Sequence, residues 1–293
     1  MMDKSVTAGH TEATAGTSPV LDRAGGLGRF TPARVGLRMA GTSLATSEIL
    51  DFQLAHARAR DAVYAALQPA HLMADLRTLD WPADGLPRFL LHSQAADRRT
   101  YLQRPDLGRK LDESSRILLE NFSASEGAGI FDLSIVFADG LSALAVERHA
   151  GPLLAQLLPL LAGVAPVLRM APTSILEQAR VAAGDEVAMA LHASLVVVLI
   201  GERPGLSSPD SLGAYITWKP NSGTTDANRN CISNIRSEGL SYRDAAARLL
   251  YYIREAHRLE QTGIALKDPS DEVCQALLHT TRETLPAETG PSL

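Results

Sequence analysis

The sequence predicts an α/β protein in which a Rossmann-like, doubly wound sheet carries an N-terminal helical extension. Residues 195–200 read Leu-Val-Val-Val-Leu-Ile, an unbroken apolar run that is typical of a strand buried on both faces of a parallel sheet. Residues 130–137 form a second apolar and partly β-branched run, and residues 142–161 follow it with apolar side chains at helical spacing. A strand, a turn and a crossover helix in this order make the repeating unit of a parallel sheet.

Length, composition and charge agree with a packed globular protein. The chain has 293 residues, of which 45% are hydrophobic and 21% charged, so a disordered or fibrous chain is excluded. The net charge of −5 argues against a nucleic-acid partner, because phosphate binding needs a basic surface. The only cysteines, Cys231 and Cys274, are too few for a disulfide framework, which favours a reducing, cytoplasmic location.

Neither export nor membrane insertion is expected. Charged residues interrupt the first part of the chain, so a signal peptide is not indicated. The most apolar segment, residues 151–168, contains three prolines and is better suited to burial beside a sheet than to lipid.

The first 35 residues differ in composition from the rest. Residues 1–35 are rich in Gly, Ser, Thr, Ala and Pro, with too few large apolar side chains to offset the entropy of ordering. They predict a flexible N-terminal arm, with a short docking or encapsulation peptide as the alternative.

Residues 36–129 are expected to form a helical N-terminal region. A helix begins at Thr46, where a capping oxygen precedes a carboxylate in the first turn, and it runs to about residue 67. A turn-rich connector follows, with a short strand near residues 89–92. A second helical pattern runs through residues 117–122.

The α/β domain is expected over residues 130–268, followed by a C-terminal tail over residues 269–293. A helical stretch is predicted at about residues 175–191, and Ser241 with Asp244 resembles a capping box before the last helix of the domain. The expected strands of the domain lie at residues 130–137, 166–170, 195–200 and 214–218.

A ligand site is expected beyond the carboxyl ends of the parallel strands, where loops meet helix starts. Three segments have the right position: residues 138–142, 201–208 and 230–236. Taken singly, each is also explained by ordinary turn and capping chemistry.

Several enzyme classes lack the motif that they need. The clustered glycines at residues 25–28 precede any strand, so a G-x-G-x-x-G dinucleotide site is not indicated, and no phosphate-binding P-loop occurs. Gly-Leu-Ser at residues 140–142 and 205–207 lacks the second glycine of a nucleophile elbow. The histidines are scattered without metal-ligand spacing. The pattern favours a chain that binds a cofactor while another subunit performs the chemistry; the alternative is a free-standing α/β hydrolase or small-molecule-binding protein.

Four motifs, read together, resemble one family. They are Arg-Pro-Asp-Leu-Gly-Arg at residues 104–109, Asp-Gly-Leu-Ser-Ala-x-Ala-Val at 139–146, Gly-Glu-Arg-Pro-Gly-Leu at 201–206 and Arg-x-Cys-Ile-Ser-Asn-Ile at 229–235. Their order and spacing across about residues 36–268 resemble the small subunit, or light chain, of ethanolamine ammonia-lyase.

This resemblance implies an adenosylcobalamin (coenzyme B12)-dependent lyase that converts ethanolamine to acetaldehyde and ammonia by a radical mechanism. It implies a large catalytic TIM-barrel subunit that holds the substrate, with the cofactor between the subunits. The location implied is cytoplasmic, with a bacterial microcompartment as a further option. No catalytic residue and no metal ligand is assigned to this chain.

The resemblance also implies which residues contact the cofactor. These cofactor-binding residues are Val181, Glu202 and Cys231. Val181 suits an apolar contact with the corrin, Glu202 can accept hydrogen bonds from its amides, and the backbone and thiol near Cys231 can serve a narrow polar contact. A redox or nucleophilic thiol is the competing interpretation of Cys231.

Overall fold

The computed structural model describes residues 30–31, 33–79, 81, 85–125, 130–163 and 166–284. Most of the predicted arm, residues 1–35, lies outside this part of the chain. The chain divides into two compact units, Met1–His56 and Ala57–Leu293.

The first unit contains a small antiparallel hairpin and the start of a helix. Strands β1 (Met39–Ala40) and β2 (Ser43–Leu44) pair with each other, and helix α1 (Thr46–Tyr64) follows. The predicted helix start at Thr46 is confirmed. Within this unit the guanidinium of Arg38 lies 2.9 Å from the carboxylate of Glu48 in the first turn of α1.

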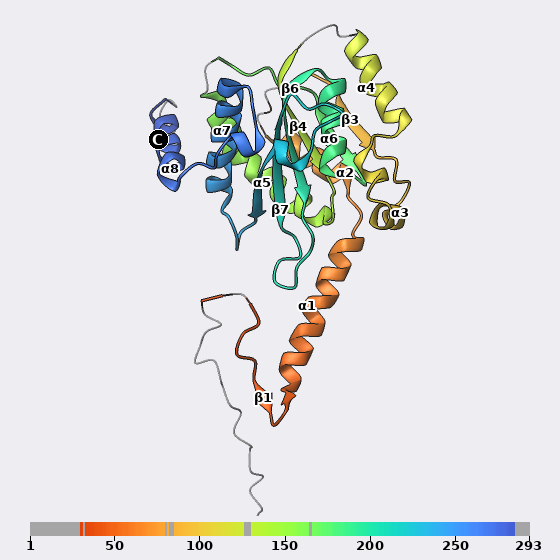
Figure 1. Cartoon of the computed structure of the whole chain (residues 1–293), viewed down its shortest axis with the longest axis vertical. Helices are drawn as coiled ribbons and strands as arrows, with labels where there is room; N and C mark the ends of the chain where they lie inside the picture. The colour runs from red at the N-terminus through yellow and green to blue at the C-terminus, as the bar shows by residue number, and fades with distance from the viewer. Residues whose placement is uncertain are drawn as a thin grey trace, which may run out of the picture. The chain divides into compact units, whose positions relative to one another are not determined.

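A mixed sheet forms the centre of the second unit (Figure 1). Its six strands lie in the order β3-β5-β4-β6-β7-β8. The first four strands in this order are parallel, and β7 and β8 are each antiparallel to the preceding one. The strands are β3 (Arg88–His92), β4 (Phe131–Ala138), β5 (Thr173–Glu177), β6 (Ala193–Gly201), β7 (Leu212–Trp218) and β8 (Arg229–Ile235).

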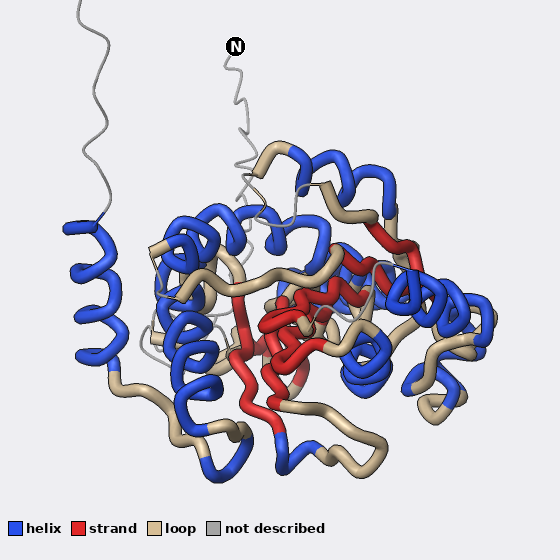
Figure 2. The backbone as a smooth tube through the Cα atoms, turned by 90° about the horizontal axis from the view of Figure 1, so that it is seen from above, coloured by secondary structure: helices blue, strands red, loops and turns tan. Residues whose placement is uncertain are grey.

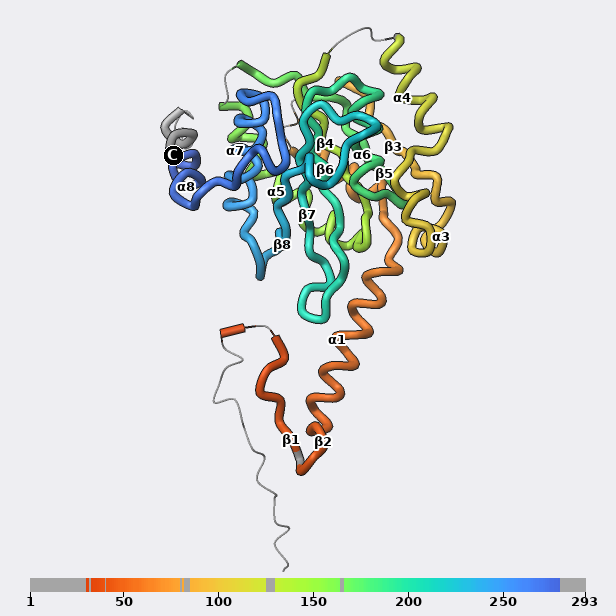
Figure 3. The backbone as a smooth tube through the Cα atoms, viewed as in Figure 1, coloured from red at the N-terminus to blue at the C-terminus, as the bar shows by residue number. Residues whose placement is uncertain are grey.

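The expectation of a parallel sheet therefore holds for β3, β5, β4 and β6 and is wrong for β7, the strand predicted at residues 214–218, which runs antiparallel to β6. Residues 202–211, which join β6 to β7, form a loop without a helix (Figure 3). A parallel neighbour needs a crossover of a dozen or more residues, usually helical, whereas a shorter loop returns the chain as an antiparallel neighbour.

Helices lie on both faces of the sheet (Figure 2). Helices α5 (Ala143–Ala162) and α7 (Tyr242–Leu259) contribute to the core on one face, while α4 (Glu113–Ser125) and α6 (Val181–Ala190) contribute to the core on the other. The other α-helices of this unit in the described residues are α2 (Pro69–Arg77), α3 (Arg98–Gln103) and α8 (Asp271–Thr284).

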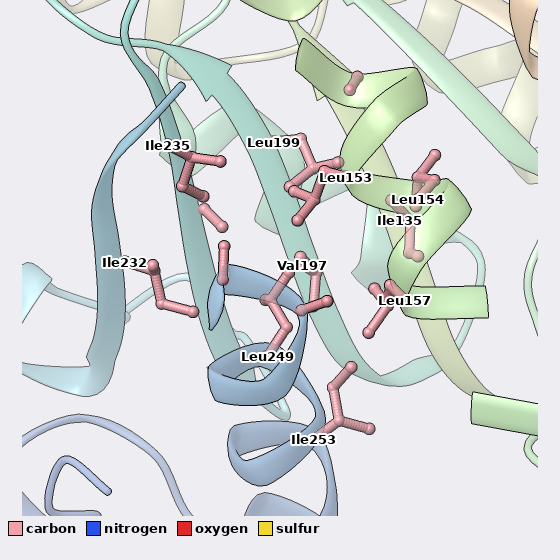
Figure 4. Packing of buried hydrophobic residues seen from close by; sticks show 14 of the residues in the cluster. Ile135, Leu153, Leu154, Leu157, Val197, Leu199, Ile232, Ile235, Leu249 and Ile253 are labelled. Atoms are coloured by element: carbon pink, nitrogen blue, oxygen red, sulfur yellow. The ribbon is translucent and has the colours of Figure 1, made fainter. Parts of the chain in front are cut away.

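Burial on both faces explains why β6 is a continuous apolar run. Val197 and Leu199 join the cluster under α5 and α7, whereas Val196 and Val198 join the cluster under α6. Successive side chains of a strand point to opposite faces, so both sets must be apolar when both faces are covered. Figure 4 shows the first cluster, in which side chains of α5 and α7 meet those of β4, β6 and β8.

The region between β4 and β6 differs from the sequence prediction. The strand predicted at residues 166–170 is reduced to a single β-bridge between Met170 and Leu133. The strand lies instead at β5, which overlaps the start of the segment predicted to be helical (about residues 175–191), and α6 begins only at Val181. Periodicity alone does not separate a short apolar strand from a helical turn. Residues 173–177 form a strand because the fold places them between β3 and β4, where they pair with both strands.

The predicted start of the last helix of the domain is confirmed, and the segment predicted as a tail contains a helix. The Ser241 hydroxyl caps α7 by accepting a hydrogen bond from the backbone N–H of Asp244. The predicted tail, residues 269–293, includes α8, whose Cys274 and Leu278 are buried in the core cluster. No helix in the described ranges has both the length and the apolar character that crossing a membrane would require.

Candidate functional site

A cavity of about 410 Å³ lies at the carboxyl ends of β4 and β6, beside the start of α6. Sequence reasoning placed the ligand site at this edge of the sheet, and two of its three segments, residues 138–142 and 201–208, contribute to the lining. The cavity is lined by Tyr101, Arg109, Gly140, Leu141, Arg180, Val181, Ala182, Ile200, Gly201, Glu202, Arg203, Tyr215 and Asp226.

Two glycines allow the ends of β4 and β6 to meet at the cavity. A Cβ atom at Gly201 would overlap the backbone carbonyl of Ser142, and one at Gly140 would overlap the carbonyl of Gly201. Gly140 also has a φ of +57°, a conformation that favours glycine. The N–H of Leu141 donates to the carbonyl of Gly201 at 2.9 Å, so the two strand ends are joined directly.

Asp139 ties the end of β4 to the loop before α6. Its buried carboxylate accepts hydrogen bonds from the backbone N–H groups of Gln178 and Ala179, each at 3.0 Å. The guanidinium of Arg98 lies 3.5 Å from the same carboxylate. Burial raises the pKa of Asp139 to about 6, although the hydrogen bonds and Arg98 act in the opposite direction.

The aromatic ring of Tyr101 in α3 contacts the guanidinium groups of Arg98 and Arg180. The phenol is fully buried and donates to the carbonyl of Ala179 at 3.2 Å. The guanidinium of Arg180 lies 4.4 Å from the centre of the ring, and that of Arg98 lies 4.8 Å from it. Burial raises the pKa of Tyr101, so the phenol stays protonated at neutral pH. Cation–π contacts of this kind hold both guanidinium groups in place.

Glu202, which follows β6, has one carboxylate oxygen engaged by the protein. Its Oε2 accepts a hydrogen bond from the Ser211 hydroxyl at 2.5 Å and one from the backbone N–H of Asn234 at 3.1 Å. Within the described residues, Oε1 makes no hydrogen bond. This arrangement holds the side chain in one orientation at the cavity wall and leaves an acceptor for a ligand.

Val181 is the first residue of α6 and lies in the same cavity as Glu202. Its side chain is partly buried against the apolar cluster beneath α6. Two of the three residues that the family resemblance assigned to the cofactor are therefore brought together, from a helix start and a strand end.

Cys231 lies next to this cavity rather than in its lining. It pairs across strands with Tyr215, which does line the cavity, and its sulfur lies 3.4 Å from the Ser233 hydroxyl. Cys231 is exposed, yet surrounding protein atoms raise the pKa of its thiol by desolvation. The thiol is therefore protonated at neutral pH, which disfavours the nucleophilic interpretation.

The third segment expected to contribute a loop, residues 230–236, is mostly strand β8. Sequence reasoning missed this strand because polar residues interrupt its apolar pattern. β8 is an edge strand with exposed Cys231 and Ser233 on one face and buried Ile232 on the other. Only its position beside β7 reveals it as part of the sheet.

A buried ion pair connects β8 to α6 near the cavity. The guanidinium of Arg229 lies 2.6 Å from the carboxylate of Asp185, and both side chains are almost fully buried. Arg229 also lies 3.6 Å from Asp226, which lines the cavity. Burial raises the pKa of Asp185 to about 6, against the attraction of Arg229.

Three arginines at the cavity were not predicted as site residues. Arg109 and Arg203 stand inside two of the motifs that carry the family resemblance, and Arg180 directly precedes Val181. Their presence in those motifs was a usable signal, but their approach to one cavity depends on the fold.

Comparison with known proteins agrees with the resemblance of the motifs. Residues 22–267 match the family model for the ethanolamine ammonia-lyase light chain (EutC). The ethanolamine ammonia-lyase small subunit of Xanthomonas campestris pv. campestris is 53% identical over 255 residues, which cover 87% of this chain and 91% of the relative. The small subunits of Ralstonia nicotianae and Azotobacter vinelandii are 54% and 55% identical over 250 and 245 residues, each covering 84% of this chain and 88% of the relative. Because identity above one half extends over most of both chains, this chain belongs to the family of ethanolamine ammonia-lyase small subunits.

Proposed function

We propose that this chain binds adenosylcobalamin at the cavity beside α6 and acts with a large subunit to convert ethanolamine to acetaldehyde and ammonia. The name small subunit, which the relatives carry, implies a large-subunit partner. One observation carries the proposal: Val181 and Glu202, which the resemblance assigns to the cofactor, line one cavity although they belong to different elements. Cys231 is adjacent to it through Tyr215.

The residues of the cavity fit the chemistry of a corrinoid edge. A corrin ring is apolar on its faces and carries amide side chains at its rim, so its site needs apolar contact and a few placed polar groups. Val181 and Leu141 supply apolar contact, and Oε1 of Glu202 can accept a hydrogen bond from an amide N–H.

The size of the cavity favours a shared site. A volume of about 410 Å³ is near the lower end of the range of about 300–1,000 Å³ for pockets that enclose drug-sized ligands. Adenosylcobalamin is much larger than such ligands, so this cavity suits one edge of the cofactor. The rest of the cofactor is left for the large subunit, in agreement with a site between two chains.

The two chains divide the work in this proposal. When bound, adenosylcobalamin supplies the radical chemistry that the rearrangement needs. This chain orients one edge of the cofactor through Glu202 and Val181 and shields that edge from water. The resemblance assigns the substrate to the large subunit, a TIM barrel, so the residues that act on ethanolamine belong to that subunit.

The substitution Glu202→Gln in the co-expressed complex tests the assignment. The amide oxygen of glutamine would have to face the N–H of Asn234, because two donors repel each other, and the amide nitrogen would then point to the ligand. A charge-assisted hydrogen bond contributes about 1.5–3 kcal/mol. We expect the dissociation constant for adenosylcobalamin to rise about 10-fold or more, measured by titration with activity recorded at each point.

In Glu202→Gln, the turnover rate at saturating adenosylcobalamin should fall much less than the affinity for adenosylcobalamin. Glu113→Gln is the matched control, because Glu113 is exposed on α4 and, among the residues that the structure describes, pairs with the surface arginine Arg116 alone. Unchanged cofactor affinity with collapsed turnover would contradict the proposal, because Glu202 would then act in catalysis rather than in cofactor binding.

A further inference from the structure

Three arginines reach the cavity from three different parts of the fold. Arg109 ends the short 3₁₀ helix Leu107–Arg109, Arg180 is the N-cap residue of α6, and Arg203 lies in the loop after β6. Within the described residues, none of the three guanidinium groups takes part in an ion pair or a hydrogen bond.

Neighbouring arginines differ in this respect. Arg98 lies 3.5 Å from Asp139, and Arg229 lies 2.6 Å from Asp185, so each has a buried carboxylate partner. These two arginines are each matched by an acid. The three arginines that line the cavity are not matched in this way within the described residues.

The carboxylates in the cavity wall do not neutralise the three arginines. Glu202 is held by the Ser211 hydroxyl and the Asn234 N–H, and Asp226 lies 3.6 Å from Arg229. Three guanidinium groups against two carboxylates leave the lining with one net positive charge, before the partial positive charge at the start of α6 is added. The electrostatics favour an anionic ligand group.

In the described residues, Nε of Arg180 has no hydrogen-bond acceptor from the protein. Its guanidinium carbon lies 4.4 Å from the centre of the Tyr101 ring, and its Nε is buried without a hydrogen-bond partner in the described part of the chain. A buried donor without an acceptor is costly, so such a group indicates a partner that the protein does not supply. The planar guanidinium matches the paired oxygens of a phosphate better than a lysine ammonium does.

We propose that Arg109, Arg180 and Arg203 form an anion subsite that takes the phosphodiester of the cobalamin nucleotide tail. The inference rests on the proposed cofactor-binding function. The phosphodiester is the only peripheral anion of the cofactor, since its amide side chains and adenosyl group are neutral. The subsite therefore orients the cofactor with its nucleotide tail toward the start of α6 and its corrin amides toward Glu202.

A comparison of two corrinoids tests the subsite in the co-expressed complex. Cyanocobalamin carries the phosphodiester and nucleotide tail, and dicyanocobinamide lacks both. In the double variant Arg180→Met and Arg203→Met, we expect cyanocobalamin to bind at least about 10-fold more weakly, equivalent to about 1.4 kcal/mol. Affinity for dicyanocobinamide should change less than about 2-fold. Equilibrium dialysis with corrinoid absorbance measures both affinities without any turnover.

Two further variants separate a lost charge from a disturbed fold. Arg180→Lys keeps the positive charge and should recover part of the affinity for cyanocobalamin, and Arg258→Met removes an exposed arginine of α7 and should change neither affinity. Inorganic phosphate should compete with cyanocobalamin in the wild type and much less in the double variant. It should not compete with dicyanocobinamide.

The outcomes distinguish this inference from the function on which it rests. Equal losses of affinity for both corrinoids, or full retention of cyanocobalamin binding by the double variant, would overturn the subsite. Phosphate competition combined with equal losses would also overturn it, because the arginines would then hold free phosphate only. A wild-type complex that binds neither corrinoid would overturn the proposed function itself.

Discussion

At the scale of single residues, two carboxylates at the cavity each hold a neighbouring residue in a left-handed conformation. Asp139 accepts from the N–H of Gln178, whose φ is +54°, and Glu202 accepts from the N–H of Asn234, whose φ is +61°. Left-handed backbone is uncommon for residues other than glycine and needs support from its surroundings. The hydrogen bonds from these two backbone N–H groups to charged acceptors provide that support.

The contact between the ends of β4 and β6 leads to a prediction at Gly201. In Gly201→Ala the new Cβ would overlap the backbone carbonyl of Ser142, and backbone atoms cannot move aside as a flexible side chain can. We expect a loss of stability of about 1–3 kcal/mol or more, together with weaker cofactor binding. Thermal denaturation of the complex measures the first effect.

Gly151→Ala in α5 is the matched control for this substitution. A Cβ at Gly151 meets no atom within 4 Å, and alanine favours a helix over glycine by about 0.5–1 kcal/mol. The control should thus be neutral or stabilising. Similar melting temperatures for the two variants would show that the strand ends tolerate a side chain, against the close approach described for them.

At the scale of elements, the loop that carries Glu202 and Arg203 is attached to α5. The hydroxyl of Ser142 donates to the carbonyl of Pro209 at 3.0 Å, and the guanidinium of Arg148 lies 2.8 Å from Asp210. Nε2 of His149 lies 3.5 Å from Asp210, and its Nδ1 lies 2.9 Å from the Tyr242 hydroxyl of α7. These contacts fix the far end of the loop, and with it the cavity wall.

The titration of His149 predicts a pH dependence for this attachment. Burial lowers the pKa of His149, and this effect outweighs the nearby Asp210. The unfolded chain thus binds the proton more readily than the folded one. The stability from His149 is present above its unfolded pKa of about 6.5 and is lost as the pH falls from there toward the folded pKa.

Comparison with His149→Gln isolates this contribution, because glutamine keeps a polar side chain but does not titrate. Melting temperatures of the complex are measured between pH 7.5 and 5.5 at constant ionic strength. We expect the wild type to lose more stability than the variant over this interval. Parallel curves would show that His149 has the same pKa in both states, and a wild type favoured at low pH would show that it is charged when folded.

At the scale of the whole molecule, the chain exposes apolar side chains that a partner could cover. In the first unit, Leu50, Leu54 and Phe52 of α1 are 57%, 51% and 46% exposed. Large apolar side chains that stay exposed along a helix are typical of an interaction surface. This observation agrees with a small subunit that functions in a complex.

The division of labour between subunits predicts that this chain is inactive alone. Expressed by itself, it should show no deamination of ethanolamine, because the proposal assigns the substrate to the large subunit, and its solubility should be lower than in the complex. Addition of the large subunit with adenosylcobalamin should restore turnover, measured as acetaldehyde formation. Robust deamination of ethanolamine by the isolated chain would contradict the proposed function.

The sequence by itself was sufficient for the elements that carry strong local patterns. The strands predicted at residues 130–137 and 195–200 are confirmed as β4 and β6 within one or two residues, and the helix predicted at residues 142–161 is confirmed as α5. Long apolar runs and helix caps determine such elements, because the residues that will be buried follow one another at regular spacing in the sequence. The motifs also indicated the family, and the resemblance assigned Val181, Glu202 and Cys231 to the cofactor, which stays a prediction.

Tertiary structure alone decided what depends on distant residues. Residues 173–177 became a strand because they fill a place between β3 and β4, and the polar edge strand β8 exists because β7 offers it hydrogen-bonding partners. The direction of β7 followed from the loop before it. The unpaired state of the cavity arginines is likewise a property of the fold, because it depends on which carboxylates lie within reach in space. Local patterns record burial and turns, whereas pairing between distant segments is settled only when the chain is packed.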